Sequence, residues 1–435
     1  MPNEGGPVSE APPVPVVHSS QSGGQGHGRA AFAFIFITVA LDMVALGIII
    51  PVLPRLIVQF EHGDMGRAAT QTGVFAFVWA AMQFVFAPVM GALSDRFGRR
   101  PVVLLSNFGL GCDYVLMALA PTLSWLFVGR VISGITAASI PTANAYIADV
   151  TPEEQRAAKF GMLGAAFGLG FIVGPAIGGF LGGYGLRYPF WASAILSLAN
   201  ALYGLFVLPE SLPKERRSAF SVKRANPVGA LRLLRSHPQL AGLAVAMFLY
   251  YNAHGSLPSM YVLYTDYRYH FSPQLTGYAF TLVGIGSTIV SAFLISLAIR
   301  RLGEARTLFT GWLCGLAGFA VLAAAPTTVL SLTSIPLLSL WGLGSPAMNS
   351  LMTKRVDKSE QGQLQGALMS MFGVAGMIAP LVFTEVFAVA ISPKWGIHLP
   401  GAPYWLAAIL MAGSLAIALN VTRRIGVPAA ATTAE

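Results

Sequence analysis

The sequence predicts an all-α membrane protein in which twelve transmembrane helices form two pseudo-symmetric six-helix bundles. The first observation is composition: of 435 residues, 55% are hydrophobic and only 10% are charged, whereas soluble domains carry about 25% charged residues. The second is a series of twelve apolar runs, each close to the roughly 20 residues that a helix needs to cross a bilayer. The third is an internal repeat that relates the first six runs to the last six. These observations exclude a soluble globular domain.

The apolar runs are separated by polar breaks or by breaks that contain Pro and Gly. Pro and Gly inside the runs are compatible with helices, because neighbouring helices satisfy the freed backbone groups and small residues allow close packing. The predicted helices occupy residues 31–56, 70–93, 102–120, 122–147, 159–183, 188–208, 239–263, 275–298, 307–325, 327–350, 364–390 and 403–421.

Three polar segments lie outside these helices. Residues 1–30 are rich in Pro, Gly, Ser and Gln and predict a disordered tail. They do not resemble a signal peptide, because no basic segment lies near Met1 and the following apolar run is long enough to span. Residues 209–238 are basic and too polar to span, so they predict a linker, and residues 422–435 form a second tail. The two bundles are therefore expected at 31–208 and 239–421.

Lysine and arginine are distributed unevenly between the two sides of the predicted membrane. With a cytoplasmic N-terminus, most of the 27 Lys and Arg residues fall in cytoplasmic segments, as the positive-inside rule requires. Both tails and the linker are therefore expected in the cytoplasm. The net charge of +9 follows from this distribution and does not indicate a nucleic-acid partner.

The repeat has one constant offset, 205 residues, over several helices and loops. Two parallel six-helix halves are typical of a large group of secondary transporters, in which the substrate binds near the bilayer midplane between the halves. The aligned pairs include Arg96 with Arg301, Pro141 with Pro346, and Pro175 with Pro380.

The stretch GALSDRFGRRP, residues 91–101, places several charges between two apolar runs. It resembles the G-x-L-x-D-R-x-G-R-R loop between helices 2 and 3 of the major facilitator superfamily, which implies a cytoplasmic latch that stabilises one alternating-access state. A plain positive-inside signal would explain the arginines but not the acid and the glycines. In the repeat, Arg300 stands in place of Asp95, so the second copy is expected to be a degenerate latch. The predicted gating residues are Gly91, Asp95, Arg96, Gly98, Arg99 and Arg100.

The stretch GLGFIVGPAIGG in the fifth predicted helix resembles the antiporter motif of the proton-coupled drug exporters in that superfamily. Glycines at this spacing form a smooth surface for close helix packing, and proline adds a kink. An ordinary small-residue interface would look similar, but the position of the whole pattern in helix 5 is typical of exporters. The motif residues are Gly170, Gly174, Pro175, Gly178 and Gly179.

The resemblance is closest to the tetracycline-efflux branch of these exporters and extends over nearly the whole chain after residue 30. It is carried by stretches such as LDMVALGIIIPVLP (41–54), AYIADVTPEEQRAAKFG (145–161) and VDKSEQGQLQG (356–366). The resemblance implies outward transport of a drug in exchange for an inward-moving proton, with tetracycline carried as a magnesium or other divalent-cation chelate.

Four ionisable residues lie within predicted helices, where they are costly and usually functional. Asp42 and Asp113 each lie about 16 Å from the cytoplasmic end of their helix, and Arg130 lies about 12 Å from the opposite end. Burial disfavours the ionised form of a carboxyl group, whereas a nearby cation favours it. An acid near Arg130 would therefore gain or lose a proton as access switches. The alternative is a structural ion pair. By resemblance, these three match positions of substrate handling and coupling, whereas Glu385 in helix 11 has no recognised counterpart.

The seventh predicted helix contains FLYYNAHGSLPSMY, residues 248–261. Asn252 stands where the tetracycline pumps usually carry a polar amide. Tyr250, Tyr251 and His254 would offer stacking and hydrogen bonds to a flat, amphiphilic ligand. A belt of interfacial aromatic residues is the alternative for the tyrosines.

Two departures from the tetracycline pumps concern the substrate. Those pumps place a histidine in helix 8 and an aspartate in helix 9, where this chain has Ser287 and Gly315. Since that aspartate is tied to proton coupling and to the cationic chelate, its loss argues against tetracycline itself and favours another substrate or another proton route. The expected cargo is a drug-like small molecule, of the tetracycline type or another amphiphilic antibiotic. We hypothesise that His254 or Glu385 compensates for the lost group.

Two other functions stay open on these residues. A metabolite or sugar transporter of the same superfamily is possible, although the helix 5 motif argues against it. A non-transporting, receptor-like member would not need Asp42, Asp113 or Arg130.

The sequence indicates neither an enzyme nor a metal site. It contains no P-loop, nucleophile elbow or metal-ligand cluster, so no cofactor is expected and the proton gradient would supply the energy. The expected partners are a small-molecule substrate, protons and the lipid bilayer. We expect a monomer in the inner (cytoplasmic) membrane of a bacterium, with both termini cytoplasmic.

Overall fold

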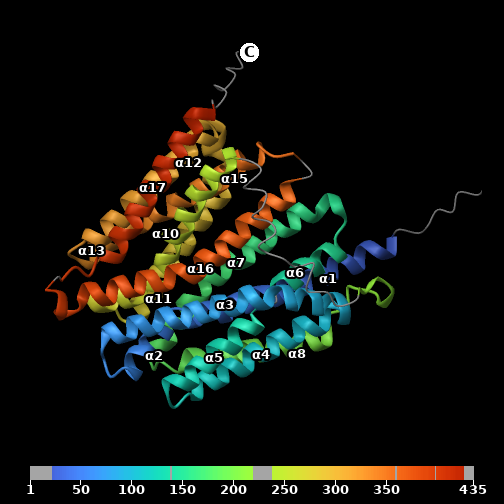
Figure 1. Cartoon of the computed structure of the whole chain (residues 1–435). Helices are drawn as coiled ribbons and strands as arrows, with labels where there is room; N and C mark the ends of the chain where they lie inside the picture. Colours follow the sequence, from blue (N-terminus) through green and yellow to red (C-terminus); the bar gives the residue numbers. More distant parts are fainter. Residues whose placement is uncertain (1–21, 138–139, 219–237, 358–359, 397, 426–435) are drawn as a thin grey trace, which may run out of the picture.

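The computed structural model describes residues 22–425, apart from residues 138–139, 219–237, 358–359 and 397. These residues are helical and form no strand. Figure 1 shows two bundles of long helices, the first blue to green and the second yellow to red, lying against each other along α3, α7, α11 and α16. The all-α fold class is therefore confirmed.

The first bundle contains the helices from α1 to α8. Their bounds are Ser22–Ile49 for α1, Leu53–Phe60 for α2, Met65–Phe97 for α3, Arg99–Leu119 for α4, Leu123–Thr136 for α5, Ile140–Val150 for α6, Glu153–Gly182 for α7 and Tyr188–Val207 for α8. A short 3₁₀ turn, Lys214–Arg216, follows in the linker.

The second bundle contains the helices from α10 to α17, with 3₁₀ turns at Trp341–Leu343 and Pro393–Trp395. The helix bounds are Pro238–Tyr269 for α10, Pro273–Ile289 for α11, Ile295–Ala324 for α12, Thr328–Leu332 for α13, Ser334–Leu340 for α14, Gly344–Thr353 for α15, Gln361–Ile391 for α16 and Ala402–Ile425 for α17. One π-helical turn, Val290–Leu294, joins α11 to α12.

Ten described stretches are long and apolar enough to cross a membrane. One of them, Pro273–Ala324, has 52 residues and leaves helical geometry at Gly303, where φ is +77°. This break separates the eighth and ninth predicted helices. The seventh corresponds to α10, which has 32 residues but is not among the ten. The described helices are therefore consistent with twelve crossings in a multi-pass membrane protein.

Two predicted boundaries are corrected. The tail was expected to extend over residues 1–30, but α1 already begins at Ser22, because extending an existing helix costs far less than starting one. For the same reason α17 continues to Ile425, beyond the predicted end of the bundle at 421. Residues 1–21 and 426–435 of the predicted tails, and 219–237 of the predicted linker, lie outside the described residues.

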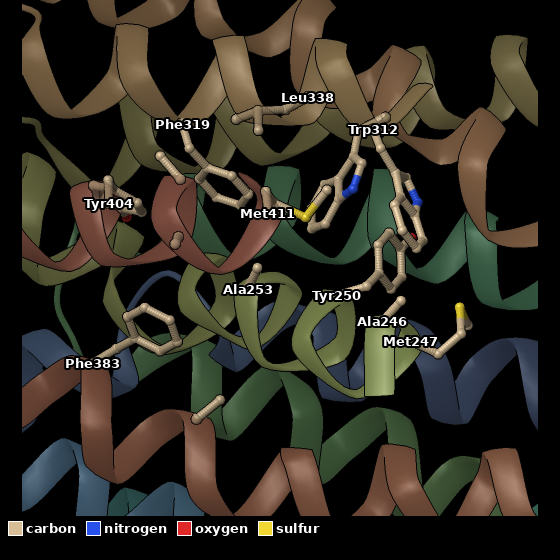
Figure 2. Packing of buried hydrophobic residues seen from close by; sticks show 14 of the residues in the cluster. Ala246, Met247, Tyr250, Ala253, Trp312, Phe319, Leu338, Phe383, Tyr404 and Met411 are labelled. Atoms are coloured by element: carbon tan, nitrogen blue, oxygen red, sulfur yellow. The ribbon is translucent and has the colours of Figure 1, made fainter. Parts of the chain in front are cut away.

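Each bundle has its own apolar core. In the second bundle a large cluster of buried residues joins α10, α12 and α17 and includes Tyr250, Trp312, Phe319 and Tyr404. Figure 2 shows these rings packed between the helices. The first bundle has smaller clusters, such as the one around Phe75, Tyr114 and Phe190. Apart from Ala69 of α3, which joins the large cluster, each core lies within one half, so the two halves can move relative to each other with little loss of core packing.

Candidate functional site

The described polar contacts between the two halves lie at one end of the bundles and at mid-depth between them. We call the end that carries residues 91–101 the loop end, and the opposite one the far end. At the far end, Arg55 of α2 pairs with Asp266 of α10 at 2.9 Å and also donates to the carbonyl oxygen of Phe271. Deeper between the halves, the Thr281 hydroxyl donates to the Ile172 carbonyl oxygen at 3.0 Å. The far end is therefore closed.

At the loop end, the helices that face the other half lack close neighbours. A Cβ atom built on Gly91 of α3, on Gly161 or Gly164 of α7, or on Gly362 of α16 would meet no atom within 4 Å. Figure 1 agrees, because the bundles diverge toward the ends at which the two chain termini leave. The space between the halves therefore opens at the loop end.

The predicted antiporter motif makes the tight packing that its glycines suggested. A Cβ atom on Gly174 would lie 2.6 Å from the Cα atom of Gly47 in α1, and a Cβ atom on Gly179 would lie 2.9 Å from the Cα atom of Gly277 in α11. Gly170 and Gly178 also lie against α1, and Pro175 lies inside α7. The motif therefore joins α7 to its own half through α1 and to the other half through α11.

Asp42, Asp113 and Arg130 are buried close to one another in the first half. Their exposed fractions are 7%, 1% and 6%. Asp42 of α1 accepts a hydrogen bond from the Asn200 amide of α8 at 2.9 Å. The hydroxyl of Tyr114, on α4, is close enough to all three for their charges to act on it. The structure thus brings together the three residues that the sequence placed on separate helices.

Within the described part of the chain the Asp113 carboxylate makes no hydrogen bond of ordinary geometry, although the Ser133 hydroxyl and the Arg130 charge lie near enough to act on it. Its Oδ1 atom lies against Gly129 of α5, where a Cβ atom would approach to 2.8 Å. Arg130 follows Gly129 and places its guanidinium 5.2 Å from the centre of the Trp79 ring. No described ion pair joins Asp113 to Arg130, so the structural ion pair considered above is not formed in this state.

Water fits this cluster better than further protein contacts do. Besides both Asp113 oxygens, Arg130 Nε, Arg130 Nη1 and Ser133 Oγ are buried without a described partner, and buried polar groups of this kind usually bind internal water. Beside Asp42, a cavity of about 10 Å³ is lined by residues of α1, α4 and α6, including Thr38, which is about the room that one water needs. The cluster can therefore exchange protons with water.

The predicted residues of α10 separate into two groups. Asn252 is only 7% exposed, and its amide donates to the Phe248 carbonyl oxygen of its own helix at 2.8 Å. Tyr250, 6% exposed, stacks on Trp312 with ring centres 5.5 Å apart. His254 and, in part, Tyr251 are accessible. Protein surrounds His254, so its exposure means that it faces an internal space open to solvent.

Glu385 does not join the other predicted residues. It is exposed, and its Oε2 atom accepts a hydrogen bond from the Thr70 hydroxyl of α3 at 3.0 Å. Its neighbour Thr384 faces Gly73 of α3. Glu385 therefore takes part in a contact between α16 and α3, and it has no described contact with Asp42, Asp113 or Arg130.

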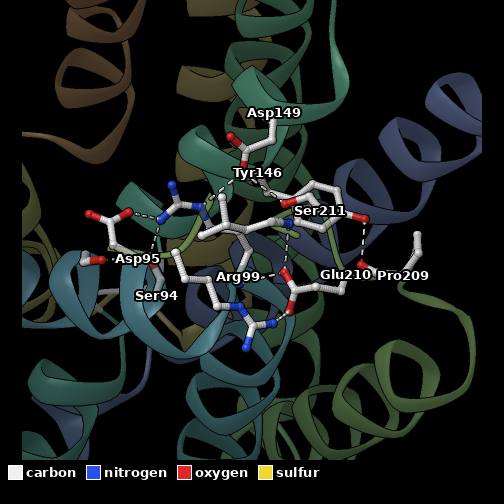
Figure 3. A network of polar contacts seen from close by, with 11 residues as sticks. Ser94, Asp95, Arg99, Tyr146, Asp149, Pro209, Glu210 and Ser211 are labelled. Atoms are coloured by element: carbon white, nitrogen blue, oxygen red, sulfur yellow. Dashed lines mark hydrogen bonds and ion pairs between the residues drawn. The ribbon is translucent and has the colours of Figure 1, made fainter. Parts of the chain in front are cut away.

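The loop at residues 91–101 is tied to its own half. Figure 3 shows Arg99 between two acids: it donates to Asp95 and, at 3.1 Å, to Asp149 of α6. The Arg99 backbone N–H donates to Glu210 at 2.8 Å.

The other predicted gating residues also contact their own half. Gly98 has φ +106°, and a Cβ atom there would overlap the Glu210 carboxylate. Arg100 donates to the Leu205 carbonyl oxygen and Arg96 lies over the Phe97 ring.

The second copy of this loop keeps one of the two ion pairs. Glu304 accepts from Lys354 at 2.7 Å and from Ser350 at 2.6 Å. Glu304 and Lys354 replace Arg99 and Asp149 after the 205-residue shift, so this ion pair is kept with its charges exchanged. The pair that Arg99 makes with Asp95 has no described counterpart, because Arg300 stands in place of Asp95 and donates to the Ser296 carbonyl oxygen.

Sequence reasoning missed two tryptophans of the second half. Trp312 and Trp341 each precede a glycine by three residues, in the stretches WLCG and WGLG. This repeated spacing was a readable signal. Asn200, which holds Asp42, was a second missed residue and could have been found as a single amide within an apolar run.

Comparison with known proteins agrees with these features. The sequence profile of the Major Facilitator Superfamily matches residues 35–380 and 269–428. The chain is 37% identical over 374 residues to the class C tetracycline resistance protein of Escherichia coli, covering 86% of this chain and 93% of that protein. It is 36% identical over 353 residues to the class G tetracycline resistance protein of Vibrio anguillarum, covering 80% and 88%.

A solved structure supports the fold. The crystal structure of the human organic anion transporter MFSD10 (TETRAN) aligns with a TM-score of 0.65 at 23% identity, covering 90% of this chain and 99% of that one. At this identity the similarity concerns the fold alone.

Proposed function

This chain belongs to the major facilitator superfamily, and on that premise we propose that it is a proton-coupled secondary transporter that exports a drug-like small molecule by alternating access. It is not an enzyme. The exported molecule is of the tetracycline type or another amphiphilic antibiotic, as the similarity to tetracycline resistance proteins supports. Export explains the helix 5 motif better than metabolite uptake does, and a receptor would not need a buried, unpaired acid.

Asp113 carries this proposal. A buried carboxylate that makes no hydrogen bond of ordinary geometry and lies close to Arg130 is costly to keep. The Asp113 carboxylate can therefore gain or lose a proton according to the side of the membrane from which water reaches it. When Asp113 binds a proton, Arg130 loses its nearby counter-charge, and a cationic substrate is no longer favoured. Proton and substrate then compete for one cluster, which is the condition for exchange.

The two ends of the molecule supply the alternation. With the far end closed by Arg55 and Asp266, a substrate enters from the loop end. We place the loop end in the cytoplasm because the basic segments gather there. Both termini are then cytoplasmic, and the protein lies in the inner membrane of a bacterium. It works as a monomer, needs no cofactor besides the proton gradient, and has no nucleic-acid partner.

Inverted vesicles that contain the full-length protein test this function. A proton gradient, acidic inside, is imposed, and the uptake of tetracycline and of other amphiphilic drugs is recorded together with proton release. Asp113→Asn is expected to abolish gradient-driven uptake. The matched control is Asp64→Asn, the same chemical change at an exposed residue that caps α3 and that asparagine caps equally well. Equal uptake by wild type and Asp113→Asn would refute the proposal.

A further inference from the structure

We propose that the second half binds substrate on an aromatic wall, formed by His254, Tyr251 and Phe372 in front of Trp341 and Tyr250, and that this wall takes a planar aromatic molecule free of bound divalent cations. The inference rests on the proposed export function and specifies its substrate class. It differs from the chelate that the resemblance to the tetracycline pumps implies.

Trp341 occupies the volume that a side chain at position 315 would take, the position at which the resemblance to the tetracycline pumps implies an aspartate. At Gly315, a Cβ atom would lie 2.5 Å from Cδ1 and 2.9 Å from Nε1 of the Trp341 indole. These distances are too short for any side chain, so an aspartate at 315 requires Trp341 to move. The acid is therefore replaced by a ring, and not merely absent.

A second contact of the same kind holds the wall in place. On the other side, Trp312 lies against Gly344, where a Cβ atom would lie 3.3 Å from the Trp312 Cγ atom and closer still to its Nε1 atom. Each W-x-x-G stretch thus packs its tryptophan on the glycine of the other. Trp312 is fully buried and Trp341 is 3% exposed, so the two rings form a packed backing that a smaller residue would loosen.

The front of the wall is open to the space between the halves. Trp341 lies behind His254, with ring centres 5.3 Å apart, and Tyr250 lies 4.9 Å from Trp341. Tyr251 meets Phe372 of α16 edge to face at 5.3 Å, and Phe372 is 50% exposed. Gly376, one turn after Phe372, has no neighbour within 4 Å. A flat ligand therefore reaches several ring faces from the loop end.

The charges around the wall select the ligand. Within the described second half, Asp266, Glu304 and Glu385 are engaged at the far end, at the loop end and on α3, respectively. The remaining described acids, Asp357 and Glu360, precede α16 at the loop end. No described contact brings a carboxylate to these rings. A chelated divalent cation would lack a counter-charge here, which is costly inside a protein. Neutral rings and single, delocalised positive charges stack favourably on aromatic faces.

The wall also offers unused donors. The indole N–H groups of Trp312 and Trp341 are buried without a described acceptor, and an unpaired buried donor is unfavourable until an acceptor arrives. A planar ligand with a carbonyl or ether oxygen at its edge would suit the Trp341 N–H once the ring shifts. This chemistry describes a planar, oxygen-bearing or singly cationic aromatic compound.

Binding to the purified full-length protein tests the wall independently of transport. Ethidium, a planar monocation, is titrated and followed by fluorescence anisotropy in the presence of EDTA. His254→Ala and Phe372→Ala are expected to raise its Kd about fivefold or more, the loss of one stacking contact. The matched control is Phe206→Ala, since Phe206 is 78% exposed on α8, and it should leave the Kd unchanged.

A paired exchange tests the metal-free character. In the double variant Trp341→Gly with Gly315→Asp, the ring is removed and an acid takes its place. We expect ethidium binding to weaken and tetracycline binding to become dependent on Mg²⁺, whereas wild type binds tetracycline equally with Mg²⁺ and with EDTA. The variant's size-exclusion profile must match wild type.

The outcomes separate the two proposals. Ethidium binding that is absent, or unchanged in His254→Ala and Phe372→Ala, overturns the wall, and so does tetracycline binding by wild type only with Mg²⁺. Export can survive either result, because proton-driven drug uptake in vesicles is measured separately. Absence of proton-driven drug uptake by the wild-type protein would refute the export function, and the binding measurements would still test the aromatic wall.

Discussion

Glu304 and Lys354 form an ion pair, with Oε1 and Nζ 2.7 Å apart, at the positions that lie 205 residues after Arg99 and Asp149, which pair at 3.1 Å between Nε and Oδ2. The two halves therefore keep the same contact and exchange its charges. Gly98 and Gly303, which share this offset, both have positive φ. The backbone turn and the ion pair of the repeat are thus preserved, although the residue types are not.

The two pairs are expected to differ in strength because they differ in burial. The Arg99 side chain is 11% exposed and donates to two acids, whereas that of Lys354 is 68% exposed. Arg99→Ala should lower the free energy of unfolding by about 2 kcal/mol or more, and Lys354→Ala by about 1 kcal/mol or less. Unfolding in detergent measures both, and an equal loss would contradict the burial argument.

Gly98 is expected to tolerate no side chain. Its φ of +106° suits glycine alone, and a Cβ atom would overlap Glu210. Gly98→Ala should cost about 1–3 kcal/mol of unfolding free energy, seen as a lower melting temperature. The control is Gly91→Ala, within helix α3 and without neighbours within 4 Å, which should be neutral or slightly stabilising. Equal melting temperatures for the two variants would count against the described turn.

Gly129 is expected to control the position of Asp113. A methyl group at this glycine would lie 2.8 Å from Asp113 Oδ1 and 2.6 Å from the Met117 side chain, so the carboxylate must move. Gly129→Ala should reduce proton-coupled transport about tenfold or more while drug binding at the aromatic wall persists. Gly164→Ala, at a glycine without close neighbours, serves as the control. Full coupled transport in Gly129→Ala would show that the position of Asp113 is not critical.

The closed far end is expected to depend on Arg55. Arg55→Gln removes the charge that pairs with Asp266 and should shift the population toward molecules open at that end. Spin labels at Gln59 and His270, both exposed near this end, report the change as a second, longer distance. The double variant Arg55→Asp with Asp266→Arg should restore the short distance. An unchanged distance distribution in Arg55→Gln would mean that apolar packing alone closes the end.

Glu385 is expected to be dispensable for coupling. It is exposed, accepts a hydrogen bond from Thr70 and has no described contact with Asp113 or Arg130, so neutralising it should leave their exchange of protons unchanged. Glu385→Gln keeps an oxygen that Thr70 can donate to, and the number of protons released per drug should equal that of wild type. A changed ratio in reconstituted vesicles would return Glu385 to the coupling machinery.

The sequence was sufficient for features that depend on composition and local pattern. Long apolar runs can be only helices in a bilayer, because every backbone group must be hydrogen-bonded within the segment. The glycines of the helix 5 motif predicted a close helix contact, and Gly174 and Gly47 make it. The positions of Asp42, Asp113 and Arg130 along their helices predicted that they lie far from either helix end, and the structure shows that they are buried.

Helix rotation and partner choice could not be predicted in this way. Glu385 and Asp113 both lie in apolar runs, yet α16 turns Glu385 outward and α4 turns Asp113 inward. Depth along a helix is a local quantity, whereas the direction of a side chain depends on the neighbouring helices. The linker residues from 219 to 237 are outside the described residues, so the predicted linker stays a prediction there.

By itself, the sequence determined the all-helical membrane fold, the two related halves, the two motifs and the three buried ionisable residues, because apolar length, a constant offset and residue spacing are properties of the chain alone. Only the tertiary structure decided that Asp113 and Arg130 stay unpaired, that Glu385 is exposed, and that Trp341 fills the space beside Gly315. These facts depend on which helices meet and at what distance, since a missing acid in the sequence does not tell what occupies its volume.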